Sequence, residues 1–221
     1  MNELNLGITR SQDAIQATNK VLRNTYMLLS MTLLFSAVTA GIAMAMNLSP
    51  GAGLILSLVS FGMIFWVHKT ADSGQGLIAI FAFTGCMGAA LGPMLNHYVA
   101  MTNGPALVMQ ALGGTALIFL SLSGYALTTR KDFSFMGGFL FVGLIVAVVA
   151  GIANIFLGIP ALSLALSAVI IMIMSGLILF DTSRIIHGGE TNYIRATISL
   201  YLNIYNIFTS LLHLLGVFND E

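Results

Sequence analysis

Polar side chains recur along one face of a long apolar segment, residues 192–213. The intervals between them are three, four, four, three, four and three residues, which is the spacing of one face of an α helix. These residues are Asn192, Arg195, Ser199, Asn203, Asn206, Ser210 and His213. A helix with such a stripe cannot face lipid along its length, because hydrocarbon offers the polar groups no partners. The pattern therefore predicts a helix that is surrounded by other helices.

Seven apolar runs in the chain are candidates for helices across a membrane, whose hydrocarbon core of about 30 Å requires roughly 20 residues of helix. They are residues 24–46, 53–67, 77–98, 106–128, 135–157, 160–180 and 193–218. Prolines at positions 50, 105 and 160 fall at or just before helix starts, where a missing N–H costs little. The expected fold is an all-α membrane protein in which six helices pack around a central, polar-striped seventh.

The positive charges are segregated to one side of these seven spans. All eight Lys and Arg residues fall in the N-terminal segment or in the loops after the second, fourth and sixth spans. They are Arg10, Lys20, Arg23, Lys69, Arg130, Lys131, Arg184 and Arg195. The positive-inside rule then puts the N-terminus in the cytoplasm and the C-terminus outside.

The spans divide the chain into a cytoplasmic N-terminal tail (residues 1–23), a seven-helix transmembrane domain (24–218) and a short outer C-terminus (219–221). The tail is too short to be a folded domain. It is either a flexible or membrane-surface lead-in, with Lys20 and Arg23 near anionic headgroups, or a cytoplasmic handle for a partner protein.

Composition agrees with a membrane protein that has little soluble mass. The 221 residues are 57% hydrophobic and 7% charged, whereas soluble domains carry roughly 25% charged residues. The formal net charge of zero gives no indication of a nucleic-acid partner. The single cysteine, Cys86, excludes a disulfide within the chain and a metal cluster of cysteines.

Asp181 is the only acidic residue expected within or near the hydrocarbon. The sixth helix should continue past it and end at Gly188–Gly189, since glycine is the usual helix terminator. On the returning seventh helix, Ser199 and Asn203 would lie roughly 10 Å and 16 Å from the start of the helix. The polar stripe should therefore pass Asp181 at about the same depth.

Two interpretations of Asp181 remain open at this point. An ionisable group inside the membrane is a functional candidate, and Asn203, Asn206, Ser199, Arg195 and Arg184 would form a polar core or ion path around it. The alternative is a structural ion pair near the interface, with Arg184 or Arg195 as the cation.

The third span contains Gly88 and Gly92, four residues apart, followed by Pro93. Small residues at this spacing let another helix approach closely. Pro93 should kink the span. The default interpretation is close packing, and the alternative is a hinge that serves permeation.

Enzymatic motifs are missing from the sequence. There is no HExxH zinc motif and no GxSxG nucleophile elbow. An intramembrane aspartyl protease needs two facing carboxylates, and only Asp181 is placed for that role. We therefore expect a protein that is not an enzyme, with no cofactor and no catalytic metal.

Several longer motifs resemble one known family, the Bax inhibitor-1 (transmembrane Bax inhibitor motif) family, over nearly the whole chain. They are Leu91-Gly92-Pro93, Leu179-Phe180-Asp181, Ser199-Leu200-Tyr201-Leu202-Asn203 and Asn206-Ile207-Phe208. Residues 20–26 and 187–197 are similar to a branch of this family in bacterial inner membranes that modulates a protease. The resemblance implies seven helices with the seventh at the centre.

The resemblance also implies two functions. One is binding and restraint of a membrane-integrated AAA metalloprotease of the FtsH type, together with regulatory partners of that protease. The other is a pH-sensitive calcium or proton leak, which some family members gate with two aspartates. The first aspartate matches Asp181, whereas the second position is Asn203, which removes one of the carboxylates that a calcium ion prefers.

Overall fold

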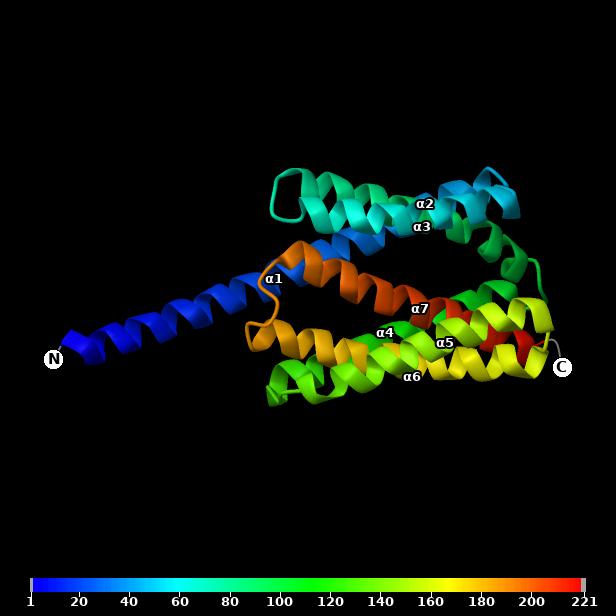
Figure 1. Cartoon of the computed structure of the whole chain (residues 1–221). Coiled ribbons are helices and arrows are strands. Elements are labelled where there is room, and N and C mark those ends of the chain that lie inside the picture. The colour runs from blue at the N-terminus through cyan, green and yellow to red at the C-terminus, as the bar shows by residue number, and fades with distance from the viewer. Residues whose placement is uncertain (1, 220–221) are drawn as a thin grey trace.

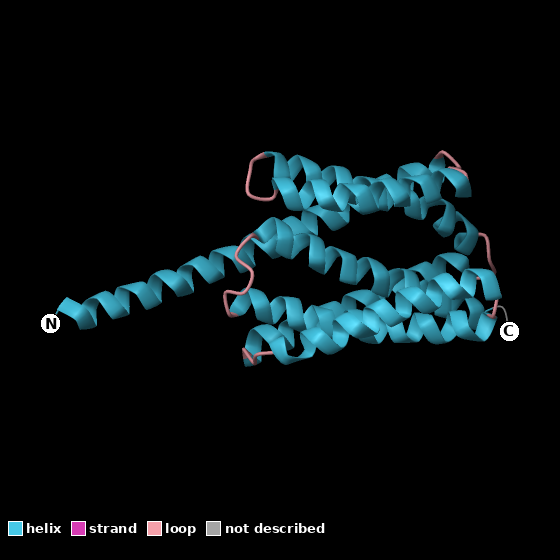
Figure 2. Cartoon of the chain, viewed as in Figure 1, coloured by secondary structure: helices cyan, strands magenta, loops and turns pink. Residues whose placement is uncertain are grey.

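The computed structural model describes residues 2–219, which form an all-helical chain (Figures 1 and 2). The helices are α1 (Asn2–Ala45), α2 (Pro50–Thr70), α3 (Gln75–Val99), α4 (Gly104–Thr129), the short 3₁₀ helix η1 (Ser134–Met136), α5 (Gly137–Leu157), α6 (Pro160–Ile186) and α7 (Tyr193–Asn219). Within the described residues, seven of them are long and apolar enough to cross a membrane. The predicted number of spans is therefore confirmed.

The ends of the helices lie beyond the apolar runs, because caps rather than hydropathy terminate them. The second span, predicted as residues 53–67, begins at Pro50, and the hydroxyl of Ser49 accepts a hydrogen bond from the N–H of Ala52. The apolar run of the sixth span ends at residue 180, but the helix continues past Asp181 to Ile186 and stops before Gly188, as predicted; the φ of Gly188, +76°, is that of a left-handed helix terminator.

α1 differs most from its predicted span. A span beginning at residue 24 was expected, but one helix runs from Asn2 to Ala45 without interruption, and its apolar part begins at Gln16. Its first turns extend away from the bundle (Figure 1). Residues 2–23 contain no proline that would break the helix. Of the expected C-terminal segment, residues 220–221 lie outside the described part of the chain.

α7 packs against α1, α2, α3, α4 and α6. From Tyr193 to Val217 every residue of α7 is buried or partly buried. α1 and α2 both pack on α3, whereas α5 packs on α6. The largest core cluster joins α1, α2, α3 and α7 through side chains such as Leu29, Phe83 and Tyr201.

Gly88 and Gly92 of α3 lie directly against α1. A Cβ on Gly88 would clash with the backbone of Ser36, and a Cβ on Gly92 would come within 2.6 Å of the Cβ of Ala43. Pro93 lies inside α3, and the C-terminal part of this helix bends away from the rest (Figure 1). The ring of Pro93 packs against Gly53 of α2.

The loops fall into two groups at opposite ends of the bundle. The α2–α3, α4–α5 and α6–α7 connections lie at the end from which α1 projects, and the remaining connections lie at the other end (Figure 1). Lys69, Arg130, Lys131 and Arg195 belong to the first group or to the helix turns beside it.

Candidate functional site

Asp181 and Asn203 meet at the contact between α6 and α7. The side-chain amide of Asn203 donates a hydrogen bond to Oδ2 of Asp181 over 2.8 Å. Asn203 is 4% exposed, and Asp181 is partly buried. The depth predicted from the residue counts along the two helices is therefore confirmed, and the polar stripe meets the acid at Asn203.

A cavity of about 510 Å³ lies beside this pair. Asp181, Ser199, Asn203 and Asn206 belong to its polar lining, together with Ser57 of α2 and Tyr205 of α7. The rest of the lining consists of apolar side chains of α2, α3, α5, α6 and α7. Ser199 and Asn206, two further residues of the predicted polar core, thus share one cavity with the Asp181–Asn203 pair.

The two arginines proposed for this core lie elsewhere. Arg184 donates to the carbonyl of Gly189 over 3.2 Å, lies 3.9 Å from the carboxylate of Glu190 and stacks over the Phe180 ring. Arg195 pairs with Asp72 over 2.5 Å. Within the described residues neither arginine forms an ion pair with Asp181, whose hydrogen-bond partner is Asn203.

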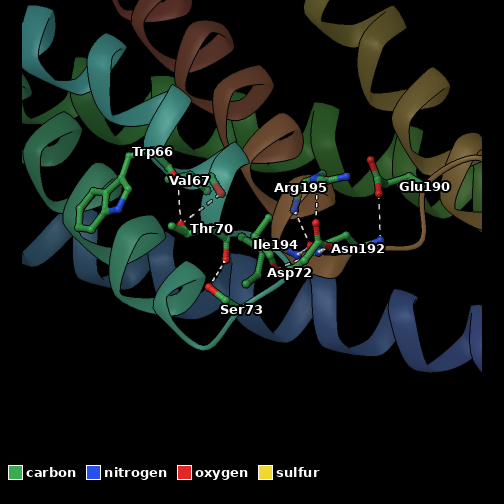
Figure 3. A network of polar contacts seen from close by, with 10 residues as sticks. Trp66, Val67, Thr70, Asp72, Ser73, Glu190, Asn192, Ile194 and Arg195 are labelled. Atoms are coloured by element: carbon green, nitrogen blue, oxygen red, sulfur yellow. Dashed lines mark hydrogen bonds and ion pairs between the residues drawn. The ribbon is translucent and has the colours of Figure 1, made fainter.

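Arg195 instead belongs to a polar network at the N-terminal end of α7 (Figure 3). The side-chain amide of Asn192 donates to the carbonyl of Ala71 and to Asp72 over 2.9 and 2.7 Å. Its carbonyl oxygen accepts from the N–H of Ile194 over 2.8 Å, which caps the start of α7. The network ties the α2–α3 loop to α7. Because the Asp72–Arg195 pair is largely exposed, it contributes only about 0–1 kcal/mol.

The remaining stripe residues are distributed along α7. The side-chain amide of Asn206 donates to the carbonyl of Leu202 in the preceding turn, over 2.8 Å. His213 forms a hydrogen bond with Ser167 of α6 over 2.9 Å, and Ser210 is buried. The stripe thus contacts the α2–α3 loop at its N-terminal end and α6 at Asn203 and His213, so no single partner helix satisfies it.

A second set of polar contacts was not anticipated from the sequence. The hydroxyl of Tyr201 on α7 lies 2.5 Å from that of Ser36 on α1, which in turn donates to the carbonyl of Thr84 on α3 over 2.6 Å. Tyr26 on α1 similarly contacts the hydroxyl of Ser123 on α4. The contacts join residues far apart in the sequence, and no spacing pattern relates them.

The chemistry open to the Asp181 site follows from its donor and acceptor groups. Asn203 can hydrogen-bond either the ionised or the protonated carboxyl of Asp181, because its amide carries both a donor and an acceptor. Across the described residues, no group of three His, Cys, Asp or Glu side chains is arranged to hold a metal ion. The site is therefore suited to hydrogen bonding within the membrane, and it offers a hard cation few carboxylate oxygens.

Comparison with known proteins relates the chain to one family. The family model described as "Inhibitor of apoptosis-promoting Bax1" matches residues 18–220. The chain is 56% identical over 209 residues to "Modulator of FtsH protease YccA" of Escherichia coli, with 94% of each chain covered. It is 55% identical to a membrane protein of Vibrio cholerae, with 96% of each chain covered, and 48% identical to a protein of Pseudomonas aeruginosa, with 89% covered.

None of these names describes an enzyme, in agreement with the expectation from the sequence. A second Escherichia coli relative, equally similar, is named as an inner membrane protein. With its seven candidate spans, the chain is a multi-pass protein of the inner membrane. The match over nearly its whole length shows that it belongs to the Bax inhibitor-1 family.

Proposed function

We propose that the chain binds a membrane-integrated AAA metalloprotease of the FtsH type and restrains it. The observation that carries this proposal is the 56% identity to the Escherichia coli modulator of FtsH protease over 94% of both chains. Identity at this level extends through the whole helical bundle rather than one motif. The partner is therefore expected to be the corresponding membrane protease and its regulatory proteins.

The proposal includes a topology with the N-terminus in the cytoplasm, the C-terminus outside and α7 at the centre of the bundle, where it contacts every other long helix except α5. The gathering of basic residues at the end from which α1 projects supports this orientation, because such residues favour the cytoplasmic side. The burial of α7 along Tyr193–Val217 supports its central place.

Restraint would arise from the resistance of the bundle to extraction. An ATP-dependent protease must pull a membrane substrate out of the bilayer, and α1 offers it an accessible end. The same helix is held by close contact with Gly88 and Gly92 and by the hydroxyls of Ser36 and Tyr201. A protease engaged on such a substrate is occupied for longer, which lowers its turnover of others.

The direct test is association with the protease and its effect on turnover. The purified chain is expected to co-purify with the protease from solubilised membranes, and its overexpression should slow degradation of a model membrane substrate. A helical membrane protein of similar size, expressed to the same level, serves as the control. Absence of co-purification, together with unchanged substrate half-life, would reject the proposal.

A second candidate function, a pH-sensitive cation leak, is favoured by one observation. An acidic residue, Asp181, lies on the wall of a cavity of about 510 Å³ among the membrane spans. Within a membrane, an ionisable group on a cavity wall is a candidate element of an ion path.

This candidate predicts that calcium or proton flux into proteoliposomes depends on the acid. Asp181→Asn should change the flux, whereas Asp72→Asn, the same substitution in the exposed pair with Arg195, should not. Asn203→Asp should increase calcium sensitivity, since it restores a second carboxylate. Flux that does not exceed that of protein-free liposomes at both acid and neutral pH would remove this candidate.

A further inference from the structure

The cavity beside Asp181 is a lateral groove between α2 and α5. We call it the α2–α5 groove; Phe61 of α2 and Val148 of α5 form its lips, and Asp181, Asn203 and Asn206 form its floor. Phe61 and Val148 are 61% and 52% exposed. Because these lips lie on two membrane spans, the groove opens toward the bilayer rather than toward water.

The two helices that flank the groove are the least covered spans of the described chain. Only 17% of each is buried, against 22–50% of the other five. α2 packs on α3 and α7, and α5 packs on α6, but in the described structure α2 and α5 do not pack on each other. Both therefore present an apolar face to an outside neighbour on either side of the same opening.

The floor of the groove presents polar groups whose hydrogen-bonding capacity is only partly used within the described residues. One oxygen of Asp181 accepts from Asn203, and its other oxygen has no hydrogen bond among the described residues. Ser199 likewise has none, and Asn206 uses only its N–H group, on its own helix. Polar groups at this depth favour association with another helix that supplies donors.

The position of Asn206 along α7 excludes a phospholipid headgroup as its hydrogen-bond partner. Asn206 is the midpoint of α7 (Tyr193–Asn219), so it lies about 20 Å from either end of the helix. Headgroups begin about 15 Å from the centre of the bilayer. A group that reaches Asn206 must therefore belong to a segment that is itself embedded in the membrane.

The size of the groove matches the side chains of such a segment. Its volume is about 510 Å³. One turn of helix with its side chains occupies roughly 500 Å³, from a diameter of about 11 Å and a pitch of about 5.4 Å. A whole helix does not fit inside, but a helix lying across the lips can insert the side chains of about one turn.

We infer that a transmembrane helix of the protease docks across the α2–α5 groove and presents a hydrogen-bond donor, from an amide, hydroxyl or basic side chain, to Asp181 and Asn206. This inference rests on the proposed function, since it locates the surface by which the protease is bound. It assigns α2 and α5 to the interface and leaves the opposite faces of these helices to lipid.

Site-specific photo-crosslinking in membranes that contain both proteins tests the interface. A photoreactive phenylalanine analogue replaces Phe61 or Val148 at the lips, or Val59 or Val146 as matched controls. Each control lies two residues earlier on the same helix, so it points to the opposite side. The controls are similarly exposed, 46% and 61%. Adducts with the protease are expected at the two lip positions and not at the controls.

Asn206→Leu supplies a second measurement that does not depend on the crosslinker. Its only hydrogen bond is to its own helix, so the bundle should fold normally. Loss of a donor–acceptor contact within the membrane should weaken co-purification of the protease about three- to twenty-fold. An unchanged amount of co-purified protease would count against the inference.

The outcomes separate this inference from the proposed function. If the protease co-purifies but the lips yield adducts only with lipid, only with a second copy of the chain, or equally with the controls, the groove assignment is wrong and the function stands. If the protease does not co-purify at all, both are wrong. Adducts confined to the lips and weakened binding by Asn206→Leu together support the docking surface.

Discussion

Gly88→Ala is expected to destabilise the bundle, although it adds only one methyl group. The new Cβ would meet the backbone of Ser36, with its Cα 2.7 Å away, and a backbone cannot move aside as a flexible side chain can. Overpacking of this kind costs typically about 1–3 kcal/mol. The α1–α3 contact would have to open, which also separates the hydroxyl of Ser36 from the carbonyl of Thr84 on α3.

The matched control is Gly113→Ala on α4, a glycine with no other group within 4 Å of a Cβ built there. Here the same substitution should raise helix stability by up to about 1 kcal/mol, because alanine loses less backbone entropy than glycine. The effect of each substitution is measured by thermal unfolding in detergent, with the fraction of monodisperse protein as the readout. Equal effects of the two substitutions would contradict the close contact at Gly88.

Asn203→Leu should have the other large effect, because it removes the hydrogen bond to Asp181 while keeping most of the side-chain volume. Oδ2 of Asp181 is then left without its only donor among the described residues. Breaking one partner of a buried polar pair costs about 1–3 kcal/mol, and more when the remaining group is charged. The expected result is a lower unfolding temperature and a lower yield of folded protein.

A double-mutant cycle identifies the cause of this loss. Asp181→Leu combined with Asn203→Leu removes both polar groups, and the combined loss should be smaller than the sum of the two single losses. Strict additivity would show that the two side chains do not interact. Ser210→Ala provides a control on the same helix, since Ser210 is buried in α7 but lies away from Asp181.

The sequence was sufficient to predict features that depend on distance along a helix. The apolar runs predicted the seven spans. Residue counts from the α6–α7 turn predicted that Asp181 lies at the depth of Asn203. Glycine at position 188 gave the end of α6. Each of these features depends only on the rise and period of a helix and on one helix-terminating glycine, which are local properties of the chain.

Features that depend on a distant segment were not predicted. Arg195 pairs with Asp72, a residue of the α2–α3 loop, and no local pattern relates the two positions. Hydropathy also failed at the start of α1, since it marks the part of a helix that suits lipid and not where the helix itself begins. The Ser36–Tyr201 contact was missed because both residues are surrounded by apolar neighbours in the sequence.

The unbroken course of α1 has a mechanical consequence. Since no hinge separates its projecting turns from the part inside the bundle, a pulling force on the first turn is transmitted along the helix axis to the contact with α3. That contact is loaded in shear, so all of its close approaches resist at once instead of peeling apart in succession. The stiffness of α1, as much as the strength of any one contact, would set the force at which the chain leaves the membrane.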